Sequence, residues 1–340
     1  MNKQLNVLVT VICLCSNQLC FSQYHFPLST ESVSARVLSL GNAGTAYNSD
    51  GSCFQTNCSG VAYQKSTILS GTYTSAYGSL SKPLSNSFWV GVIIPYQPFS
   101  FACNWVRSSS SDVHSSPDLF SLSFSEREKK LNQGTVFSFV PQMNDAVTIS
   151  IAKQNIITLD WGWNQYSMPI EIPVGINVRY AYSTINNLTG SGIAFDVGGS
   201  LKINLRDMAY DDNYPKISLG WMLRNIGGMN LHWSNNNSDY TYYQHSFGMA
   251  IEQPLSILES HVNILYDTRS EYGGSNNLGI EWTYRKYLSV RCGVSSSNFT
   301  TGIGVDLDFF NVDYGYKYGS YEVLGNVHRL TCAFRLEKLL

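Results

Sequence analysis

Charge is scarce in this chain of 340 residues, since only 14% of them are charged, against roughly 25% in an average soluble domain. No stretch approaches the ~20 apolar residues that a helix needs to cross a bilayer, which excludes a helical membrane protein. With 22 basic and 24 acidic residues, a net charge of -2 and no basic stripe, the chain offers no footprint for nucleic acid. Aromatic residues at 13% exclude a disordered chain, because such chains are poor in aromatics.

The N-terminus has the features of an export signal. Lys3 supplies a positive charge, Leu5 to Leu14 is an apolar run of signal-peptide length, and Ser22 is a small residue just before Gln23. We therefore predict a signal peptide over residues 1–22, cleaved near Ser22–Gln23. The alternative for this stretch is a buried first strand.

Cysteine does not provide a scaffold. Of the eight cysteines, five remain after cleavage: Cys53, Cys58, Cys103, Cys292 and Cys332. An odd number cannot pair completely within one chain. Cys53 and Cys58 are five positions apart in a Gly/Ser/Asn-rich loop and could form a disulfide in an oxidising compartment, or stay as two free thiols.

Catalytic and metal-binding patterns are also lacking. The motifs of serine hydrolases, P-loop proteins and dinucleotide-binding proteins do not occur. Asp207, Asp211 and Asp212 crowd one loop without the spacing or the closing Glu of a calcium site, so we expect a solvated turn. No histidine has a partner at metal-ligand spacing. We predict a protein that is not an enzyme and has no cofactor. The six histidines are His25, His114, His232, His245, His261 and His328.

What the chain has in abundance is alternation with period two, the pattern of a two-faced β-strand. Ile193, Phe195 and Val197, for example, alternate with Ala194 and Asp196. In the clearest segments every charged residue lies on the polar face, so the strands have two chemically distinct faces. The phase slips between Phe309 and Phe310. These segments are 193–206, 217–224, 278–285, 303–309, 310–318 and 329–336.

Two folds share this pattern. A soluble β-sandwich buries its apolar face against a second sheet, whereas a transmembrane barrel turns that face to lipid. The polar face here is rich in Gly, Ser, Asn and Thr, as a packed lumen requires. Tyr and Trp also sit near strand ends, where an interfacial girdle belongs. We therefore favour the barrel. These aromatic residues are Trp161, Trp163, Tyr180, Tyr182, Trp282, Tyr284, Tyr316 and Tyr318.

The strand number follows from length. Residues 67–340 would hold about 14 strands at roughly 20 residues per strand and turn, given tilted strands of ~10 residues, and the range 12–16 is compatible. Bacterial barrels have an even count, and the wall must close because lipid offers no hydrogen-bond partners. We predict an all-β, transmembrane antiparallel barrel over residues 67–340, preceded by an N-terminal plug or periplasmic segment over residues 23–66.

Several short stretches of the chain form recognisable motifs. Residues 34–46 read SARVLSLGNAGTA and residues 57–62 read NCSGVA. These stretches resemble the N-terminal signature of the PorV/PorQ-type proteins of the FadL-like outer-membrane superfamily. The match departs at Leu40, and at Cys58 and Ser59 where the family has Pro-Ala. At the C-terminus, VDYGY (312–316) and LGNVHRL (324–330) are similar to the family's last hairpin and strand. GIAFDVG (192–198) and LRNIGG (223–228) resemble mid-barrel stretches.

The resemblance implies a roughly 14-stranded barrel with a short segment folded into its lumen. In that segment we expect Gly41, Gly44, Asn57 and Gly60 to form the plug motif, where glycine permits tight turns. Charges on the polar face of the strands should point into the lumen, as a salt-bridged structure or as ligand contacts. These are Arg224, Glu281, Arg285, Asp306, Asp308, Asp313, Lys317, Arg329 and Arg335.

For function, the resemblance implies an outer-membrane component of type IX-like protein secretion or surface attachment, with secretion proteins as partners. The alternative is a FadL-like channel for hydrophobic molecules such as long-chain fatty acids. A secreted β-sandwich that binds a partner is less favoured, and an outer-membrane enzyme comes last. A secretion partner needs long ordered loops, for which residues 162–172 and 228–243 are candidates. A channel needs an apolar pocket that reaches an opening.

Overall fold

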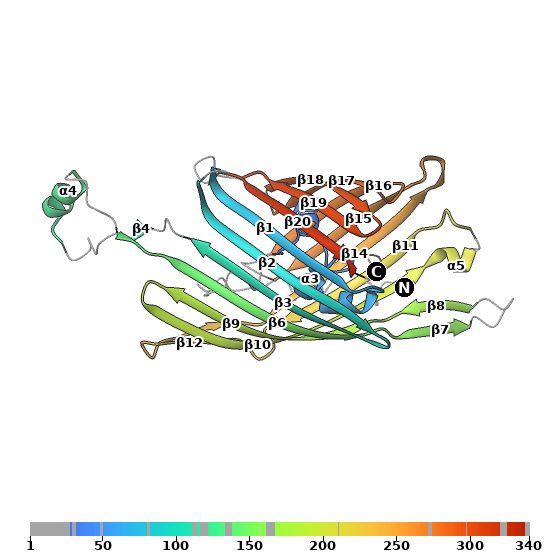
Figure 1. Ribbon diagram of the computed structural model, residues 1–340, viewed down its shortest axis with the longest axis horizontal. Coiled ribbons are helices and arrows are strands. Elements are labelled where there is room, and N and C mark those ends of the chain that lie inside the picture. Colours follow the sequence, from blue (N-terminus) through green and yellow to red (C-terminus); the bar gives the residue numbers. More distant parts are fainter. Residues whose placement is uncertain are drawn as a thin grey trace, which may run out of the picture.

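The first and last strands of the sheet are neighbours, and their pairing closes the sheet into a barrel (Figure 1). β1 runs antiparallel to β20, with Ile68 opposite Arg335 and Ala76 opposite Val327. This computed structural model describes residues 28, 32–47, 50–79, 82–110, 114–115, 122–132, 138–160, 167–209, 211–270, 274–296, 298–319 and 325–336. The predicted signal peptide (1–22), Trp161 and Trp163 lie outside these residues.

Within the described residues, fourteen antiparallel strands follow one another around the wall, as predicted. Their bounds are β1 (Ile68–Ser79), β2 (Lys82–Tyr96), β3 (Phe99–Ser110), β6 (Gln142–Lys153), β9 (Val174–Ile185), β10 (Leu188–Asn204), β11 (Lys216–Arg224), β14 (Gln244–Leu255), β15 (Ser260–Arg269), β16 (Ser275–Tyr284), β17 (Leu288–Ser295), β18 (Asn298–Leu307), β19 (Phe310–Lys317) and β20 (Val327–Arg335).

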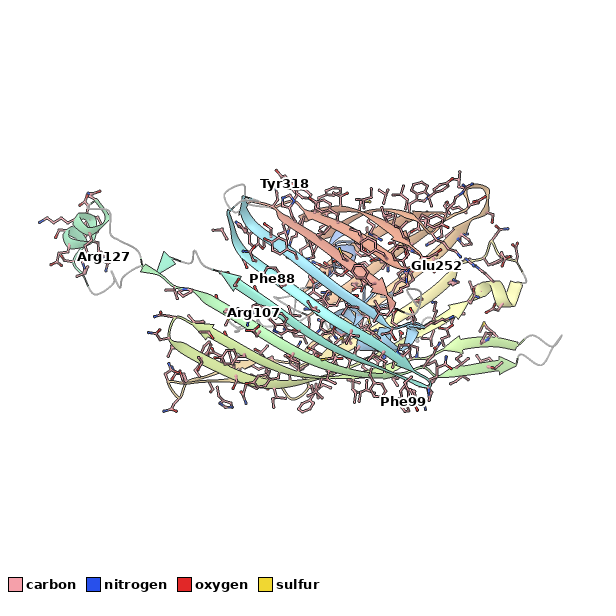
Figure 2. The ribbon with its side chains drawn as sticks, in the orientation of Figure 1. Phe88, Phe99, Arg107, Arg127, Glu252 and Tyr318 are labelled. Atoms are coloured by element: carbon pink, nitrogen blue, oxygen red, sulfur yellow. The ribbon has the colours of Figure 1, made fainter. Side chains whose placement is uncertain are left out.

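The alternation of the sequence becomes the two faces of this wall, because successive side chains of a strand point to opposite sides. Ile193 and Phe195 are 55% and 53% exposed, whereas Ala194 and Asp196 between them are 0% and 2% exposed. Phe99 likewise lies on the outer surface, at the start of β3 (Figure 2). An apolar outer face on a closed antiparallel barrel confirms the predicted barrel and excludes the sandwich, whose apolar face would be buried.

Two irregularities of the sequence mark tight turns. The phase slip at Phe309–Phe310 occurs because β18 ends at Leu307 and β19 begins at Phe310, so Asp308 and Phe309 form the turn. The segments on either side of Pro95 and Pro98 are separate strands, β2 and β3, which pair directly beyond the turn at Gln97 and Pro98.

Shorter elements extend the barrel at its two ends. We call the end where β1 begins and β20 finishes the terminal end, and the opposite one the distal end. The β7–β8 hairpin and α5 project at the terminal end, and the β12–β13 hairpin lies at the distal end (Figure 1). The described part of one predicted partner loop, residues 167–172, and the other predicted loop, residues 228–243, therefore belong to opposite ends. The bounds are β7 (Ile156–Asp160), β8 (Ser167–Glu171), α5 (Leu205–Ala209), β12 (Met229–Trp233), β13 (Ser238–Thr241) and η3 (Ser256–Leu258).

The long connection between β3 and β6 carries a separate two-stranded sheet and a polar helix, which Figure 1 shows away from the barrel. In the described part of the chain, no helix is both long and apolar enough to span a bilayer. These elements are β4 (His114–Ser115), α4 (Phe124–Asn132) and β5 (Ser138–Phe139).

The interior of the barrel is filled by the N-terminal segment. Its short helices are α2 (Ala35–Ser39), α3 (Cys53–Thr56) and the 3-10 helix η2 (Cys58–Tyr63). Nearly all of their residues are buried, although the segment precedes the first strand. The core of this protein is therefore the contact between the segment and the inner wall, and we call described residues 28–66 the plug.

Candidate functional site

The plug is folded by local caps. The Ser34 hydroxyl accepts a hydrogen bond from the Val37 backbone N–H at 3.4 Å and begins α2. The Asn57 side-chain oxygen accepts from the Ser59 N–H and hydroxyl at 3.1 and 2.8 Å, and so begins η2. Such caps satisfy N–H groups that short helices leave free.

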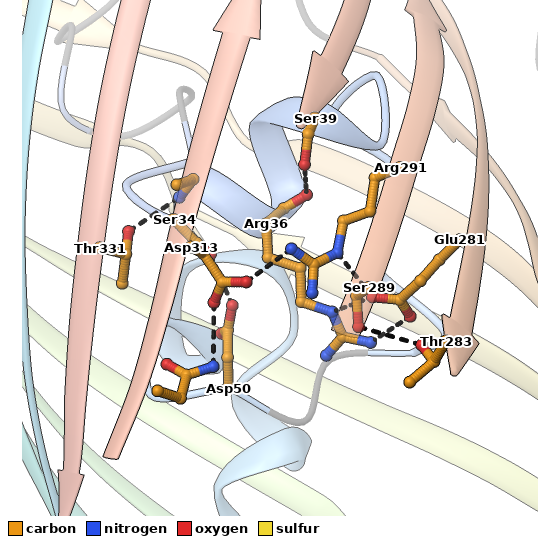
Figure 3. A network of polar contacts seen from close by, with 12 residues as sticks. Ser34, Arg36, Ser39, Asp50, Glu281, Thr283, Ser289, Arg291, Asp313 and Thr331 are labelled. Carbon is orange, nitrogen blue, oxygen red and sulfur yellow. Dashed lines mark hydrogen bonds and ion pairs between the residues drawn. The ribbon is translucent and has the colours of Figure 1, made fainter. Parts of the chain in front are cut away.

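A chain of charges joins the plug to the wall (Figure 3). Arg36 of α2 donates to both oxygens of Glu281 on β16, at 3.0 and 2.7 Å. Arg291 of β17 donates to Glu281 at 2.6 Å and to Asp313 of β19 at 2.5 Å. Asn263 adds a donor to Glu281 at 2.9 Å. Because each charge is paired and hydrogen-bonded, this network can exist in a buried site.

A second carboxylate holds the turn after α2. Oδ2 of Asp267, on β15, accepts from the backbone N–H groups of Gly44 and Thr45 at 2.9 Å each and from the Thr45 hydroxyl at 2.7 Å. Arg269 on the same strand donates to the carbonyl of Asn42. The turn is thus fixed by one anion on its donors and one cation on its acceptor.

Other arginines hold the plug by its carbonyl groups. Arg224 of β11 donates from Nε and Nη2 to the Gln55 carbonyl at 3.2 and 2.6 Å. Arg329 of β20 donates to the carbonyls of Ser32 and Ser34. The wall residues that touch the plug are therefore spread around the barrel.

The residues of the predicted plug motif lie inside the lumen. Gly41 has a φ of +66°, and a Cβ there would lie 2.5 Å from the Val294 carbonyl oxygen on β17. Asn57 donates to the carbonyls of Thr45 and Gly199, at 2.8 and 3.0 Å. The N–H of Gly60 donates to the Asn57 carbonyl at 2.9 Å. Asn57 is thus a central link between two parts of the plug and the wall.

Wall glycines let the plug approach closely. A Cβ at Gly220 would collide with the Thr45 carbonyl, and one at Gly279 would lie 2.5 Å from the Leu40 carbonyl oxygen. On eight strands, plug atoms lie close to the position that a Cβ would occupy at an inward-facing glycine. These glycines are Gly175, Gly198, Gly220, Gly248, Gly279, Gly293, Gly302 and Gly315.

The predicted lumen charges divide into two groups. Arg224, Glu281, Asp313 and Arg329 are 1–5% exposed and point inward. The rest lie near the ends: Asp306 pairs with Arg335 at 2.8 Å near the mouth of the terminal end, Lys317 is half-buried at the end of β19, and Asp308 is exposed in the β18–β19 turn.

Arg285 is placed outside the lumen. It lies in the turn after β16 and pairs with Glu259, with the two side chains 54% and 66% exposed. The alternation of side chains holds only within a strand, and the two strands end at Tyr284 and Leu307. It therefore could not place Arg285 or Asp308, which follow them.

The disulfide considered for Cys53 and Cys58 is not formed. Both are buried free thiols, Cys53 in α3 and Cys58 at the start of η2. Cys53 packs with Val61 and Ile93, whereas the Cys58 sulfur lies toward Gly198. Burial raises the pKa of both thiols, and nearby carboxylates raise it further.

A polar cavity of about 230 Å³ opens beside the charged network near the terminal end. Arg36, His261 and Glu281 contribute to its lining. Across the described ranges, no group of His, Cys, Asp or Glu is arranged to hold a metal ion. Most of its lining residues are charged or polar, so the cavity can hold water beside the charges.

Apolar residues gather on the other side of the lumen. Phe54 of α3 packs against Trp89 of β2, with ring centroids 5.9 Å apart. We call the set of buried residues around this pair the lumen cluster. Its members are Leu28, Val33, Phe54, Trp89, Val106, Ala146, Ala181, Ala194 and Met229.

The wall beside the lumen cluster has an interrupted ladder. β10 pairs with β11 over residues 197–204 and with β12 at Gly190 and Ser191, while the turn Asn225–Gly228 lies between. Residues 192–196 of β10 thus have no strand partner on this side among the described residues. The turn is held instead by Ile226 N–H, which donates to the Phe195 carbonyl at 2.8 Å.

A buried polar group closes the interruption. The Asn225 N–H and Arg179 both donate to Asp196 Oδ1, at 3.0 and 3.2 Å, and Arg179 also donates to the Asn225 side chain at 2.6 Å. Met229, which follows the turn, is fully buried, whereas Ile226 is 41% exposed on the outside. Apolar residues therefore stand on both sides of a wall segment held by side chains.

Sequence reasoning missed the residues that do most to join plug and wall. Arg36 stands in the quoted N-terminal signature, and Asp267 and Arg291 lie on the inward face of alternating strands. The motif could therefore have indicated Arg36, and the alternation could have indicated Asp267 and Arg291. Trp89 and Met229 could not be found in this way, because alternation predicts a polar inner face.

No family model matches the chain, and no curated protein matches it as a relative. Solved structures do. The CymD monoaromatic hydrocarbon channel is 11% identical with a TM-score of 0.53, covering 92% of this chain and 99% of its own. The Ralstonia pickettii toluene transporter TbuX is 9% identical with a TM-score of 0.51, covering 92% and 100%. The P. putida toluene transporter TodX is 8% identical with a TM-score of 0.50, covering 90% and 97%. At such identities the likeness establishes the fold.

Proposed function

We propose that this chain is a non-enzymatic β-barrel of the bacterial outer membrane that passes small hydrophobic molecules. The fold is that of hydrocarbon channels and toluene transporters. The apolar outer face suits lipid, which is the natural surrounding of a closed antiparallel barrel. Such a channel is the alternative to protein secretion that follows from the sequence, and we now prefer it.

The observation that carries the proposal is the contact of the lumen cluster with the interrupted ladder. Met229 and Ala194 belong to the cluster and also border the turn Asn225–Gly228. An apolar molecule in the cluster would therefore be separated from lipid at this place by the turn and the start of β12, and not by a paired strand. In the other described parts of the wall, neighbouring strands pair directly.

The plug keeps this route closed in the structure. Its first part, residues 32–46, is held by ion pairs and hydrogen bonds to β15–β20. Phe54 of its second part covers Trp89 mainly by apolar contact. Passage requires Phe54 to give way, and the charged network keeps the rest of the plug in place.

Two experiments test the proposal in order. Boiled and unboiled samples from detergent-extracted membranes are first compared by gel mobility, where a shift of the unboiled band indicates a stable closed barrel. Uptake of radiolabelled toluene and of a long-chain fatty acid is then measured in cells that express the chain and in vector controls. Uptake equal to the vector for both, with a folded barrel present, would refute the proposal.

A matched pair of variants locates the route. Met229→Gln places an amide in the lumen cluster and should reduce uptake severalfold. Met222→Gln makes the same change at another inward-facing, 1% exposed methionine, which lies outside the cluster. Equal loss in both variants would argue against the route through the cluster.

Protein secretion is the second candidate, favoured by the ordered β12–β13 hairpin. Tyr242 and Tyr243, which follow it, are 48% and 61% exposed at the distal end and offer a surface for a partner. Deleting residues 230–241 should abolish export of surface-attached proteins if this role is correct. The PorV/PorQ-type assignment itself stays a prediction.

A further inference from the structure

A row of inward-facing residues crosses five neighbouring strands in direct register. Trp89 of β2 lies opposite Val106 of β3, Val106 opposite Ala146 of β6, Ala146 opposite Ala181 of β9, and Ala181 opposite Gly192 of β10. Side-chain size decreases along this row from an indole to a hydrogen atom. With strands ~4.8 Å apart, four steps make a path about 19 Å long. We call it the Trp89–Gly192 row.

The Trp89–Gly192 row is bordered by polar residues on both sides. Toward the terminal end, Asn104 and Arg179 each keep a buried nitrogen, Nδ2 and Nε, without a hydrogen-bond partner among the described residues. The apolar surface along β3, β6 and β9 is therefore only one residue wide. The border positions are Ser87, Ser108, Asn144 and Ser183 on the distal side and Asn104, Thr148 and Arg179 on the terminal side.

The row ends at the interrupted ladder. Gly192 is the first β10 residue without a strand partner, and a Cβ there would collide with the Asn230 carbonyl. At its other end the row is covered by Phe54, which packs on Trp89. It thus connects the contact that the plug must release to the part of the wall that lacks a ladder.

We infer that the Trp89–Gly192 row is the path along which the ligand lies, and that the side chains of Val106, Ala146 and Ala181 set the greatest width that passes. The inference rests on the proposed function and narrows it to slender apolar molecules, one aromatic ring or one unbranched chain wide. A wider molecule would press apolar surface on the polar borders, which costs free energy because their hydrogen-bonding groups would be left unpaired.

The test uses the full-length chain in cells and compares uptake of toluene with uptake of 1,3,5-trimethylbenzene, which is wider than one ring in every orientation of its plane. Ala181→Leu should lower the trimethylbenzene-to-toluene ratio about tenfold or more, since even one methylene group in an apolar site discriminates by roughly 10–200-fold. Val106→Ala widens the row and should raise the ratio. Ala152→Leu is the matched control, because Ala152 also faces inward on β6 and is 1% exposed but lies off the row.

Unboiled gel mobility verifies that each variant is folded, and if Ala181→Leu fails to fold, Val106→Ala decides alone. An unchanged ratio in folded Ala181→Leu, or in Val106→Ala, overturns the inference, as does an equal shift in Ala152→Leu. These outcomes differ from failure of the proposed function, in which the unmodified chain takes up neither hydrocarbon above the vector level.

Discussion

Arg36 and Glu281 are separated by 245 positions in the sequence, yet they form a two-point ion pair between the plug and the wall. Their side chains are 12% and 2% exposed. Glu281 also accepts from Arg291 and Asn263, so it is the common acceptor of the network. Replacing Glu281 therefore affects both Arg36 and Arg291.

Glu281→Gln should therefore destabilise the folded barrel more than Arg36→Met does. Removing one partner of a buried ion pair costs about 3–5 kcal/mol because the other charge stays unpaired. Here Arg36 loses the carboxylate that holds it, and Arg291 keeps only Asp313 as a charged acceptor. The measurement is the temperature at which half of the unboiled gel band is lost. Glu259→Gln removes the exposed pair with Arg285 and should change stability by about 1 kcal/mol or less. Similar effects of Glu281→Gln and Glu259→Gln would contradict the central role of the network.

Gly220→Ala should destabilise the barrel by about 1–3 kcal/mol, because a methyl group there collides with the Thr45 carbonyl and over-packs the contact. Gly71→Ala is the control: its Cβ would meet only the Trp89 carbonyl oxygen at 3.4 Å, an ordinary contact. Urea unfolding of both variants in detergent micelles gives the comparison. Equal stability of the two would mean that the plug does not lie against β11.

The thiols of Cys53 and Cys58 should report on the plug. Burial raises the pKa of each, with Asp50 and Asp196 adding to the effect, so little thiolate is present near neutral pH. Since the thiolate is the reactive form, alkylation of the folded protein should be slow at pH 8. The alkylation rate of the folded protein should keep rising above pH 9. The rate for an ordinary cysteine, with a pKa of about 8.5, rises little further there because most of it is already thiolate.

This experiment uses a chain in which Cys103, Cys292 and Cys332 are serine, and mass spectrometry follows the label. Glu281→Gln should speed the labelling, because it loosens the anchored part of the plug. Fast labelling of the parent at pH 8 would show that the plug leaves the lumen readily.

Ile176→Lys should lower the yield of folded barrel in lipid. Ile176 is 52% exposed on the outer face of β9, and a lysine on the lipid face costs roughly 2–4 kcal/mol at the membrane midplane. Thr158→Lys places the same charge on the exposed β7, which projects at the terminal end, and should be tolerated. The measurement is the fraction of heat-shifted band after refolding into vesicles. Equal yields would mean that β9 does not face lipid.

The barrel itself could be predicted because period-two alternation is a local property of each strand. Ile193 and Asp196 were placed on opposite faces from their positions alone, and the structure agrees. Arg285 and Asp308 were misplaced because alternation cannot tell the last residue of a strand from the first of a turn.

The site was less predictable because it depends on register. Nothing local in the sequence indicates that Ala146 faces Ala181, or that Trp89 begins a row across β3 and β6. The proximity of Arg36 and Glu281 likewise arises only when the barrel closes around the plug. Even the spacing of Cys53 and Cys58 was misleading, because a helix and a 3-10 helix direct the two thiols to different neighbours.

The pairing of β1 with β20 also links closure of the wall to the position of the plug. The Ala35 N–H donates to Thr331 and the Ser32 carbonyl accepts from Arg329, so the last strand binds both the first strand and the segment that precedes it. A chain lacking β20 would therefore lose both the strand that closes the wall and the Thr331 and Arg329 contacts that hold the start of the plug.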